Sequence, residues 1–243
     1  MSTPVLSLRG VTKRFGGLVA VNAMDFDVAE REVLGLLGPN GSGKSTTLNL
    51  ISGALPLTSG HVSLWGNRIS GLPAQTITRK GVSRTFQLVR LLPSMNVREN
   101  VVAGAVFGHR RRWGQDAWDH ADALLDKVGL GGKGDMALGQ LTYIDTKRVE
   151  LARTLASDPK VLLLDEWLAG LNPTELQIGI TLIKSLRDEG RTIILVEHVM
   201  DAIRSLCDRC VVMASGTKIA EGTPTQVLSD KEVIRAYLGD DDA

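Results

Sequence analysis

A glycine-rich turn between an apolar strand and a helix is the feature that most constrains this sequence. Residues 38–46 read GPNGSGKST, which fits the pattern G-x-x-x-x-G-K followed by Ser or Thr. The apolar run Val33–Leu37 precedes the turn, and Lys44–Ser52 has helical spacing. This order of strand, turn and helix predicts an α/β fold with a phosphate-binding loop over residues 38–46.

The residue types of the phosphate-binding loop suit the triphosphate of a nucleotide. Glycines let the backbone bend so that successive N–H groups converge on phosphate oxygens, and the following helix adds unpaired N–H donors and the positive end of its dipole. Lys44 supplies a charge for the β- and γ-phosphates, and the Ser45 hydroxyl can ligate Mg²⁺. The residues expected to bind the nucleotide are Gly38, Asn40, Gly41, Ser42, Gly43, Lys44, Ser45 and Thr46.

A second, acidic part of the expected nucleotide site follows another apolar strand. Val161–Leu164 is a run of four apolar residues, and Asp165 and Glu166 come directly after it. Ligands collect at the carboxyl ends of the strands in open α/β sheets. We therefore expect Asp165 to hold the Mg²⁺ shell and Glu166 to orient or deprotonate the attacking water. The alternative interpretation is a structural Asp-Glu pair that opens a helix.

Two further polar residues also follow apolar strands. Gln87 comes after Val82–Phe86, and His198 comes after Ile193–Val196 and Glu197. Gln87 could reach the metal or its water, and His198 could hydrogen-bond the γ-phosphate. Either residue alone is more often a capping or surface residue, but their order at strand ends favours one shared site.

The rest of the chain alternates between strand and helix patterns. Residues 5–28 read as strands, whereas the spacing of apolar residues from 97 to about 158 is helical. Pro173 stands where it favours the start of a helix. Apolar strands bounded by helices indicate a parallel sheet that is covered on both faces. The other expected strands are His61–Trp65, Val82–Gln87, Val161–Leu164, Thr192–Val196 and Val211–Met213.

Composition and charge remove several other classes of protein. With 28 basic and 27 acidic residues the formal net charge is +1, so no bulk field directs this chain to nucleic acid. No apolar run approaches the roughly 20 residues that span a bilayer, and Met1–Arg14 lacks the apolar core of a signal peptide. We expect a cytoplasmic protein in which Cys207 and Cys210 are reduced structural thiols rather than a redox pair or half a zinc site.

Together these residues resemble the nucleotide-binding subunits of ABC transporters, and in particular those of branched-chain amino acid importers. The resemblance extends from about Val5 to Gly239, and the ending Ala236–Gly239 is typical of that branch. Phe15 matches the aromatic residue that stacks on adenine, and residues 171–173 resemble a loop that crosses the dimer interface. The residues that match the family's phosphate-binding lysine, magnesium ligands, catalytic glutamate and switch histidine are Lys44, Ser45, Gln87, Asp165, Glu166 and His198.

The resemblance implies one nucleotide-binding domain over residues 1–243. Residues 1–90 and 158–243 would form a P-loop NTPase core with a mainly parallel sheet and an N-terminal antiparallel β subdomain, and residues 91–157 an inserted helical subdomain. It also implies ATP and Mg²⁺ as cofactors, and a place on the cytoplasmic face of the plasma membrane. The implied partners are a second ATPase subunit, two membrane-spanning permease subunits and, indirectly, an external solute-binding protein.

A contact surface for a permease is expected after Gln87. Leu91, Leu92 and Met95 lie in sequence beside Arg90 and Arg98, so these residues could form an apolar groove with a basic rim. The alternative is ordinary packing of the helical subdomain. In the family, closure of two ATPase subunits around two ATP molecules moves the helical subdomains and drives the permeases between inward- and outward-facing states.

The sequence departs from the family at its signature motif. The family has Leu-Ser-Gly-Gly-Gln, with Tyr often replacing the first Gly in this branch, whereas residues 141–145 read LTYID. Ile144 adds bulk where the family's bare backbone approaches the γ-phosphate, and Asp145 brings a carboxylate towards a polyanion. Because the signature acts in trans, we expect a heterodimer with one catalytic and one degenerate site. Trp167, where proline is usual, is a second departure.

Three other functions fit parts of this pattern. A lipopolysaccharide-exporter ATPase is the nearest, because its carboxyl ending is similar. A non-transport regulatory ABC protein usually carries two such cassettes in one chain, and this chain has one. A GTPase or small-molecule kinase is disfavoured because the guanine-reading Asn-Lys-x-Asp pattern is absent. The preferred function is an ATPase that powers import of branched-chain amino acids or related small polar solutes.

Overall fold

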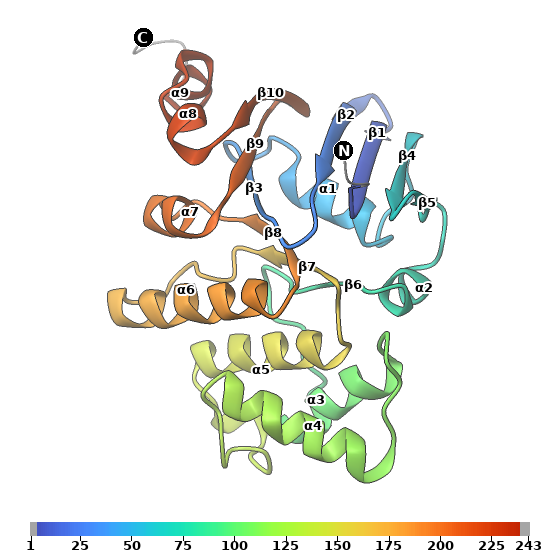
Figure 1. Cartoon of the computed structure of the whole chain (residues 1–243), viewed down its shortest axis with the longest axis vertical. Coiled ribbons are helices and arrows are strands. Elements are labelled where there is room, and N and C mark those ends of the chain that lie inside the picture. Colours follow the sequence, from blue (N-terminus) through green and yellow to red (C-terminus); the bar gives the residue numbers. More distant parts are fainter. Residues whose placement is uncertain (1–3, 239–243) are drawn as a thin grey trace. The chain divides into compact units, whose positions relative to one another are not determined.

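The computed structural model describes residues 4–238, which form two compact units (Figure 1). The first unit combines Met1–Ala74 with Leu168–Ala243, and the second is Gln75–Trp167. The expected helical segment 91–157 lies within the second unit, which also contains the strands around residues 82–84 and 161–165. Gly239 and the acidic run Asp240–Asp242 lie outside the described residues.

An antiparallel sheet forms the N-terminal part of the first unit, as predicted. Its strands follow the order β2-β1-β4-β5, and β1 pairs antiparallel with both β2 and β4 (Figure 1). Along β2, Met24, Phe26 and Val28 are buried, because the side chains of a strand point to alternate faces and one face lies on the core. Val21 is buried too, beyond a register shift in the pairing with β1. The bounds are β1 Leu6–Phe15, β2 Leu18–Val28, β4 Ser59–Leu64 and β5 Asn67–Arg68.

Four further strands of the first unit lie in the order β10-β9-β3-β8. Strand β3 runs parallel to β8 and β9, whereas β10 returns antiparallel to β9. Every residue of β3 and β8 is buried, as expected for parallel strands covered on both faces. The bounds are β3 Val33–Leu37, β8 Thr192–Val196, β9 Arg209–Ala214 and β10 Thr217–Gly222.

Two helices of the first unit, α6 and α8, begin at capping boxes. Asn172 and Glu175 form a capping box at the start of α6, and Pro173 occupies its first turn, where a proline costs no hydrogen bond. Thr223 and Gln226 form a second capping box at α8. The bounds are α1 Lys44–Ile51, α6 Pro173–Asp188, α7 Met200–Leu206, α8 Pro224–Leu228 and α9 Lys231–Leu238.

The second unit is mainly helical and contains two parallel strands, β6 and β7. Helices α3, α4 and α5 pack on one another through apolar residues such as Val101, Leu125 and Val149, which are all buried. Asn96 and Glu99 form a capping box at the start of α3. The bounds are α2 Ala74–Arg79, β6 Val82–Arg84, α3 Val97–Phe107, α4 Gly114–Lys127, a 3-10 helix Leu138–Gln140, α5 Tyr143–Ala156 and β7 Val161–Asp165.

The prediction of a strand over residues 82–87 is wrong beyond Arg84, where β6 ends. The buried carboxylate of Glu150 on α5 accepts hydrogen bonds from the backbone N–H groups of Phe86, at 3.3 Å, and Arg90, at 2.8 Å. A side chain therefore satisfies donors that a strand would direct to a neighbouring strand. Burial raises the pKa of Glu150.

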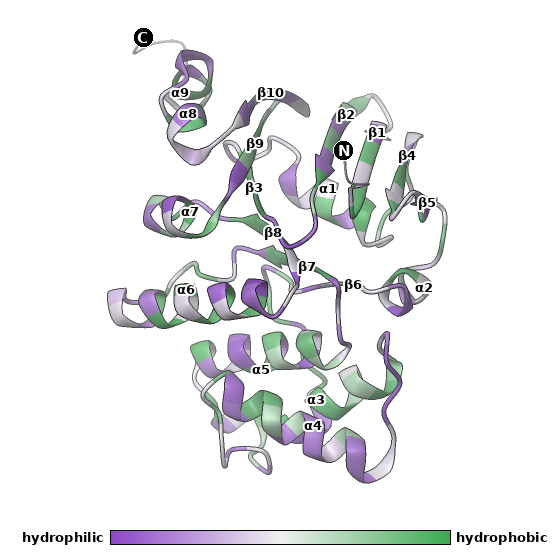
Figure 2. Cartoon of the chain, in the orientation of Figure 1, coloured by the Kyte–Doolittle hydropathy of each residue, from purple (hydrophilic) through white to green (hydrophobic). Residues whose placement is uncertain are grey.

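Hydropathy varies along the helices rather than being uniformly apolar. Figure 2 shows hydrophobic and hydrophilic residues alternating along α4 and α6. Among the residues that the structure describes, no helix is both long and apolar enough to cross a bilayer.

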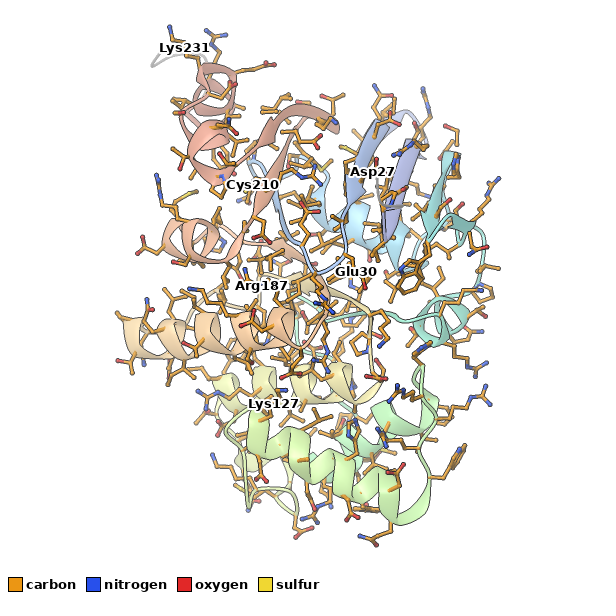
Figure 3. The ribbon with its side chains drawn as sticks, viewed as in Figure 1. Asp27, Glu30, Lys127, Arg187, Cys210 and Lys231 are labelled. Carbon is orange, nitrogen blue, oxygen red and sulfur yellow. The ribbon has the colours of Figure 1, made fainter. Side chains whose placement is uncertain are left out.

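Cys207 and Cys210 are free, buried thiols in the first unit. Cys207 follows the last residue of α7, and Cys210 lies on β9, where Figure 3 labels it. A Cβ placed on Gly35 would lie 2.9 Å from one sulfur and 3.0 Å from the other, so Gly35 leaves the space that both thiols fill. Their mutual hydrogen bond and burial raise the pKa of Cys207. Residues 4–238 contain no cluster of potential metal ligands around these thiols or elsewhere.

Candidate functional site

The phosphate-binding loop of the first unit requires its glycines. Gly38, Gly41 and Gly43 have φ angles of 143°, 77° and 104°, which side chains with a Cβ rarely adopt. A Cβ at Gly38 would lie 2.1 Å from the carbonyl oxygen of Met213, and one at Gly43 would lie 2.5 Å from that of Ala20. The tight course of the loop therefore depends on residues without side chains.

The start of α1 is arranged to accept an anion. Gly43 is its N-cap, no side chain within residues 4–238 caps it, and its first turn contains no acidic residue. Lys44 curls over the loop, where its Nζ donates to the carbonyl oxygens of Gly38, at 2.8 Å, and Pro39, at 2.9 Å. Within the described chain, the buried Ser42 hydroxyl has no hydrogen-bond partner. An uncapped helix start, an ammonium and an orphaned hydroxyl fit a phosphate group.

An unexpected contact joins this loop to the C-terminal helix α9. The N–H of Gly38 donates to the Tyr237 hydroxyl at 2.8 Å, and burial raises the pKa of that hydroxyl. Sequence reasoning noted residues 236–239 only as a typical ending of the branch. A tyrosine on a short terminal helix carries no pattern that would point to a loop 199 positions earlier in the chain.

Phe15 lies at the end of β1, paired with Leu18 across the turn between β1 and β2. Its ring is 46% exposed, and the Lys13 ammonium lies 4.9 Å from the ring centroid. An exposed ring with a cation on it can offer a flat surface to a purine base.

In the second unit, Asp165 is the last residue of β7 and is 2% exposed. Its Oδ2 accepts a hydrogen bond from the Arg84 guanidinium at 3.1 Å. Burial lowers the pKa of Arg84, and Asp165 opposes that effect. The predicted metal-binding carboxylate is thus held at the end of its strand, with its charge balanced by the neighbouring strand β6.

Glu166 and Gln87 lie together, as the sequence predicted for parts of one site. The Gln87 side-chain amide donates to the Glu166 carboxylate at 2.9 Å. Glu166 has a φ of 51°, a left-handed conformation that costs a residue with a Cβ about 1–2 kcal/mol. Its carbonyl oxygen accepts a hydrogen bond from Lys147 Nζ at 3.2 Å. Its side chain therefore leaves the end of β7 at a direction that the surrounding residues fix.

His198 belongs to the first unit, where it is exposed and lies two residues beyond the end of β8. The preceding Glu197 is buried, and its Oε1 accepts a hydrogen bond from the N–H of Leu168 at 2.6 Å. Glu197 was not among the expected site residues. Its role here is to fix the segment that follows Trp167, which a sequence pattern does not reveal.

The signature segment, residues 141–145, forms the start of α5. The Thr142 hydroxyl caps the helix by accepting from the N–H of Asp145 at 3.1 Å. The Asp145 carboxylate lies 2.8 Å from Lys133 Nζ and 3.7 Å from an Arg148 nitrogen. The expected repulsion by Asp145 is therefore reduced by two neighbouring cations. Tyr143 is exposed, and Ile144 is half-buried.

The residues expected to form a permease contact are only partly arranged as predicted. Leu92 and Met95 are exposed, and so is Leu88, which was not predicted. The guanidinium of Arg90 lies over the Phe86 ring, 4.4 Å from its centroid. Arg98 does not provide a free basic rim, because its guanidinium is bonded to Asp122 and Asp135.

Comparisons with known proteins match the whole chain to one group. A family model described as "ABC transporter" matches residues 21–169, and one described as "Branched-chain amino acid ATP-binding cassette transporter" matches residues 217–243. The chain is similar to BraF of Pseudomonas aeruginosa, a high-affinity branched-chain amino acid transport ATP-binding protein. The two are 40% identical over 257 residues, which cover 99% of this chain and 100% of BraF.

A second relative and a solved structure agree with this match. LivG of Escherichia coli, which carries the same description as BraF, is 40% identical over 254 residues, covering 99% of this chain and 100% of LivG. The fold is similar to the crystal structure of an ATP-binding cassette of an ABC transporter in its ADP conformation. The TM-score is 0.88 at 29% identity, over 98% of this chain and 100% of that one.

Proposed function

Because the chain belongs to the ABC transporter family, we propose that it is the ATP-hydrolysing subunit of an importer for branched-chain amino acids or related small polar solutes. The observation that carries this proposal is the uncapped start of α1, with Lys44 and the orphaned Ser42 hydroxyl beside it. That arrangement supports binding of a triphosphate. The 40% identity with BraF and LivG over nearly the whole chain supports the transport role.

In this proposal the phosphate-binding loop holds the nucleotide. The backbone N–H groups at the start of α1 would donate to the phosphates, and Lys44 would move from the loop carbonyls to the β- and γ-phosphates. Phe15 would stack on the adenine ring. Ser45, Gln87 and Asp165 are the residues that would hold Mg²⁺, which supplies charge neutralisation at the transferred phosphoryl group.

Glu166 is the residue proposed to activate the attacking water. Its carboxylate would accept a proton from the attacking water or orient it, and the amide of Gln87 at 2.9 Å would keep the carboxylate in place. His198, exposed after β8, would donate a hydrogen bond to the γ-phosphate. In this proposal these side chains would act on the charge that develops in hydrolysis, where fixed donors and cations lower the barrier most.

The proposed partners are two permeases, an external solute-binding protein that acts through them, and a second ATPase subunit. The exposed residues Leu88, Leu92 and Met95 support a permease contact, because clustered exposed apolar side chains mark interaction surfaces. The chain would work on the cytoplasmic face of the plasma membrane. The permeases and the binding protein would select the cargo.

The second ATPase subunit is proposed to be a different chain. Ile144 and Asp145 stand where the family has a glycine and a glutamine, so the ATP bound by a partner would meet a poor signature here. Losing one well-placed donor to a developing oxyanion costs about 10²–10³ in rate. A partner with an intact signature would leave one efficient site, built on Lys44, Glu166 and His198 of this chain.

Purification through a tag on this chain from the native host, with its membrane partners, tests the assignment. Glu166→Gln in the purified complex should reduce ATP turnover by about 10³-fold, whereas the equivalent change in the partner subunit should have a much smaller effect. Equal effects of the two changes would refute the asymmetry. A complex that contains no permease would refute the transport role.

A further inference from the structure

Trp167, which directly follows Glu166, is anchored to the helix that carries the signature segment. Its side chain is 5% exposed, and its indole Nε1 donates to the backbone carbonyl oxygen of Lys147 at 3.2 Å. Lys147 lies on α5, in the second turn after Tyr143. A buried indole N–H needs an acceptor, and here that acceptor belongs to α5.

Lys147 makes the reciprocal contact. Its side chain is buried, at 4% exposure for the residue, and its Nζ donates to the carbonyl oxygen of Glu166 at 3.2 Å. The ammonium also lies 5.7 Å from the centroid of the Tyr143 ring. Trp167 and Lys147 thus exchange hydrogen bonds between side chain and backbone in both directions. We call this pair the Trp167–Lys147 clamp.

The clamp encloses the residue whose geometry matters most to hydrolysis. Glu166 is in the left-handed region, with a φ of 51°, which a residue with a Cβ keeps only where surrounding contacts hold it. Lys147 binds its carbonyl group, and the next residue, Trp167, is anchored by its indole. With the backbone fixed, the Glu166 carboxylate accepts the hydrogen bond from Gln87 at 2.9 Å.

We propose that Trp167 and Lys147 are positioning residues for the Glu166 carboxylate in ATP hydrolysis. This inference rests on the proposed catalytic role of Glu166. The clamp acts through the backbone of Glu166, and neither of its residues is among those proposed to bind the nucleotide. It should therefore affect the chemical step and leave nucleotide binding unchanged. Small displacements of a reacting group can cost up to about 10²-fold in rate.

The two halves of the clamp can be removed separately. Trp167→Phe keeps an aromatic ring and removes the N–H donor, while Lys147→Met keeps the backbone carbonyl and removes the ammonium. Each change should lower kcat about tenfold at unchanged KM for ATP. Together they should cost little more than either alone, because the two bonds hold one conformation. Lys147→Arg, which keeps a cationic donor, should restore most of the rate.

Matched controls lie in the same unit. Trp113 is 63% exposed and Lys160 is exposed, so Trp113→Phe and Lys160→Met should leave kcat unchanged. ATP turnover would be measured on the tagged transporter complex, with the binding of a fluorescent ATP analogue as a check that each variant retains its folded nucleotide site. Wild-type turnover in Trp167→Phe and Lys147→Met would overturn the inference. So would additive losses in the double variant, or a loss confined to thermal stability.

A second measurement needs no turnover. In a variant with Trp65→Phe, Trp113→Phe and Trp118→Phe, which keeps Trp167, acrylamide should quench Trp167 emission weakly in the nucleotide-free protein. Adding Lys147→Met should increase that quenching, because one half of the clamp no longer holds the segment. Unchanged quenching would contradict a joint action of the two residues. Full ATP turnover in Glu166→Gln would refute the proposed function. The quenching measurement would still show whether Lys147 holds Trp167, because it does not depend on turnover.

Discussion

Two helix starts in this molecule carry the family's phosphate-contacting sequences, and they are built in opposite ways. Helix α1, in the first unit, begins after Gly43, with no side-chain cap from residues 4–238 and no acidic residue in its first turn. Helix α5, in the second unit, begins after Thr142, whose hydroxyl caps it, and has Asp145 in its first turn. The backbone N–H donors at the start of α1 therefore remain for a ligand, whereas side chains near the start of α5 occupy one of its donors and add a negative charge.

This difference shows how a helix start loses or keeps affinity for an anion. The positive end of the helix dipole is common to both. At α5, however, the Thr142 oxygen accepts from one N–H, and the first turn already contains a carboxylate, Asp145, whose charge is paired with Lys133. Capping of this kind stabilises the helix by about 1 kcal/mol. Stability and anion binding therefore compete for the same groups.

The largest expected change in ATP hydrolysis comes from a substitution at the start of α1. Lys44→Ala removes the ammonium that curls over the loop, so the negative charge of the phosphates would lose its main side-chain partner. We expect kcat/KM for ATP hydrolysis to fall by at least about 10³-fold, as measured on the purified complex. Lys184→Ala, at an exposed position of α6, is the matched control. A fall below tenfold would show that α1 is not the start that binds phosphate.

A smaller change, an increase in ATP turnover, is expected from substitutions at the start of α5. Ile144→Gly with Asp145→Gln restores the family's residues at the helix start, which should raise ATP turnover by the isolated chain, as a dimer with itself, by about 10²-fold. The same change breaks the Asp145 contacts to Lys133 and Arg148, so the free energy of unfolding should fall by about 1–3 kcal/mol.

Two single variants separate the effect of the Asp145 charge from the effect of the Ile144 side-chain volume. Asp145→Asn removes the charge and keeps a side chain of similar size, whereas Ile144→Gly removes the bulk alone. If neither these variants nor the double variant raises turnover, then the signature segment does not limit hydrolysis, and the contrast between the two helix starts has no functional meaning. A rise in turnover without any loss of stability would indicate that Lys133 finds another partner.

The α1 side was predictable from sequence because its chemistry is local. A phosphate-binding loop needs glycines, a lysine and a hydroxyl at fixed spacing, and the backbone angles at Gly38, Gly41 and Gly43 follow from that need. The predicted α/β fold with parallel strands was also correct, because fully apolar strands bounded by helices indicate a covered parallel sheet. The antiparallel β subdomain, which the family resemblance implied, is present as well. Gln87 and Glu166 were expected to share one site, and their side chains are hydrogen-bonded, although β6 ends at Arg84 and not beside Gln87.

The remaining contacts join residues far apart in sequence, where no local pattern constrains the pairing. Glu150 ends β6 by binding Phe86 and Arg90 from 60 and more residues away, and this contact made the predicted strand too long. Lys133 neutralises Asp145 from the loop before α5, so the sequence overstated the free charge at that helix start. Trp167 looked like an isolated departure until its indole was seen to bond to Lys147.

The smallest expected change follows from removing the hydrogen bond between α9 and the phosphate-binding loop that precedes α1. The N–H of Gly38 at the head of the phosphate-binding loop donates to the Tyr237 hydroxyl on α9, whereas the N–H of Asp145 at the start of α5 is capped by Thr142, three positions away. Tyr237→Phe removes that acceptor and keeps the ring, so the unfolding free energy should fall by about 1 kcal/mol. If the loop shifts in response, KM for ATP should rise by up to about fivefold.

The pH dependence of stability tests whether the Tyr237 hydroxyl is buried beside Gly38 in the folded state. Burial raises the pKa of Tyr237 above its ordinary value, so the folded state keeps the proton more tightly than the unfolded chain does. The stabilisation is fully present below the unfolded pKa of about 10 and is lost as the pH rises through the higher folded pKa. Urea unfolding from about pH 9 to about pH 11 should therefore show a steeper loss of stability in the wild type than in Tyr237→Phe. Parallel curves would show that the Tyr237 hydroxyl is no more buried in the folded state than in the unfolded chain, and α9 would then support the loop only through the ring.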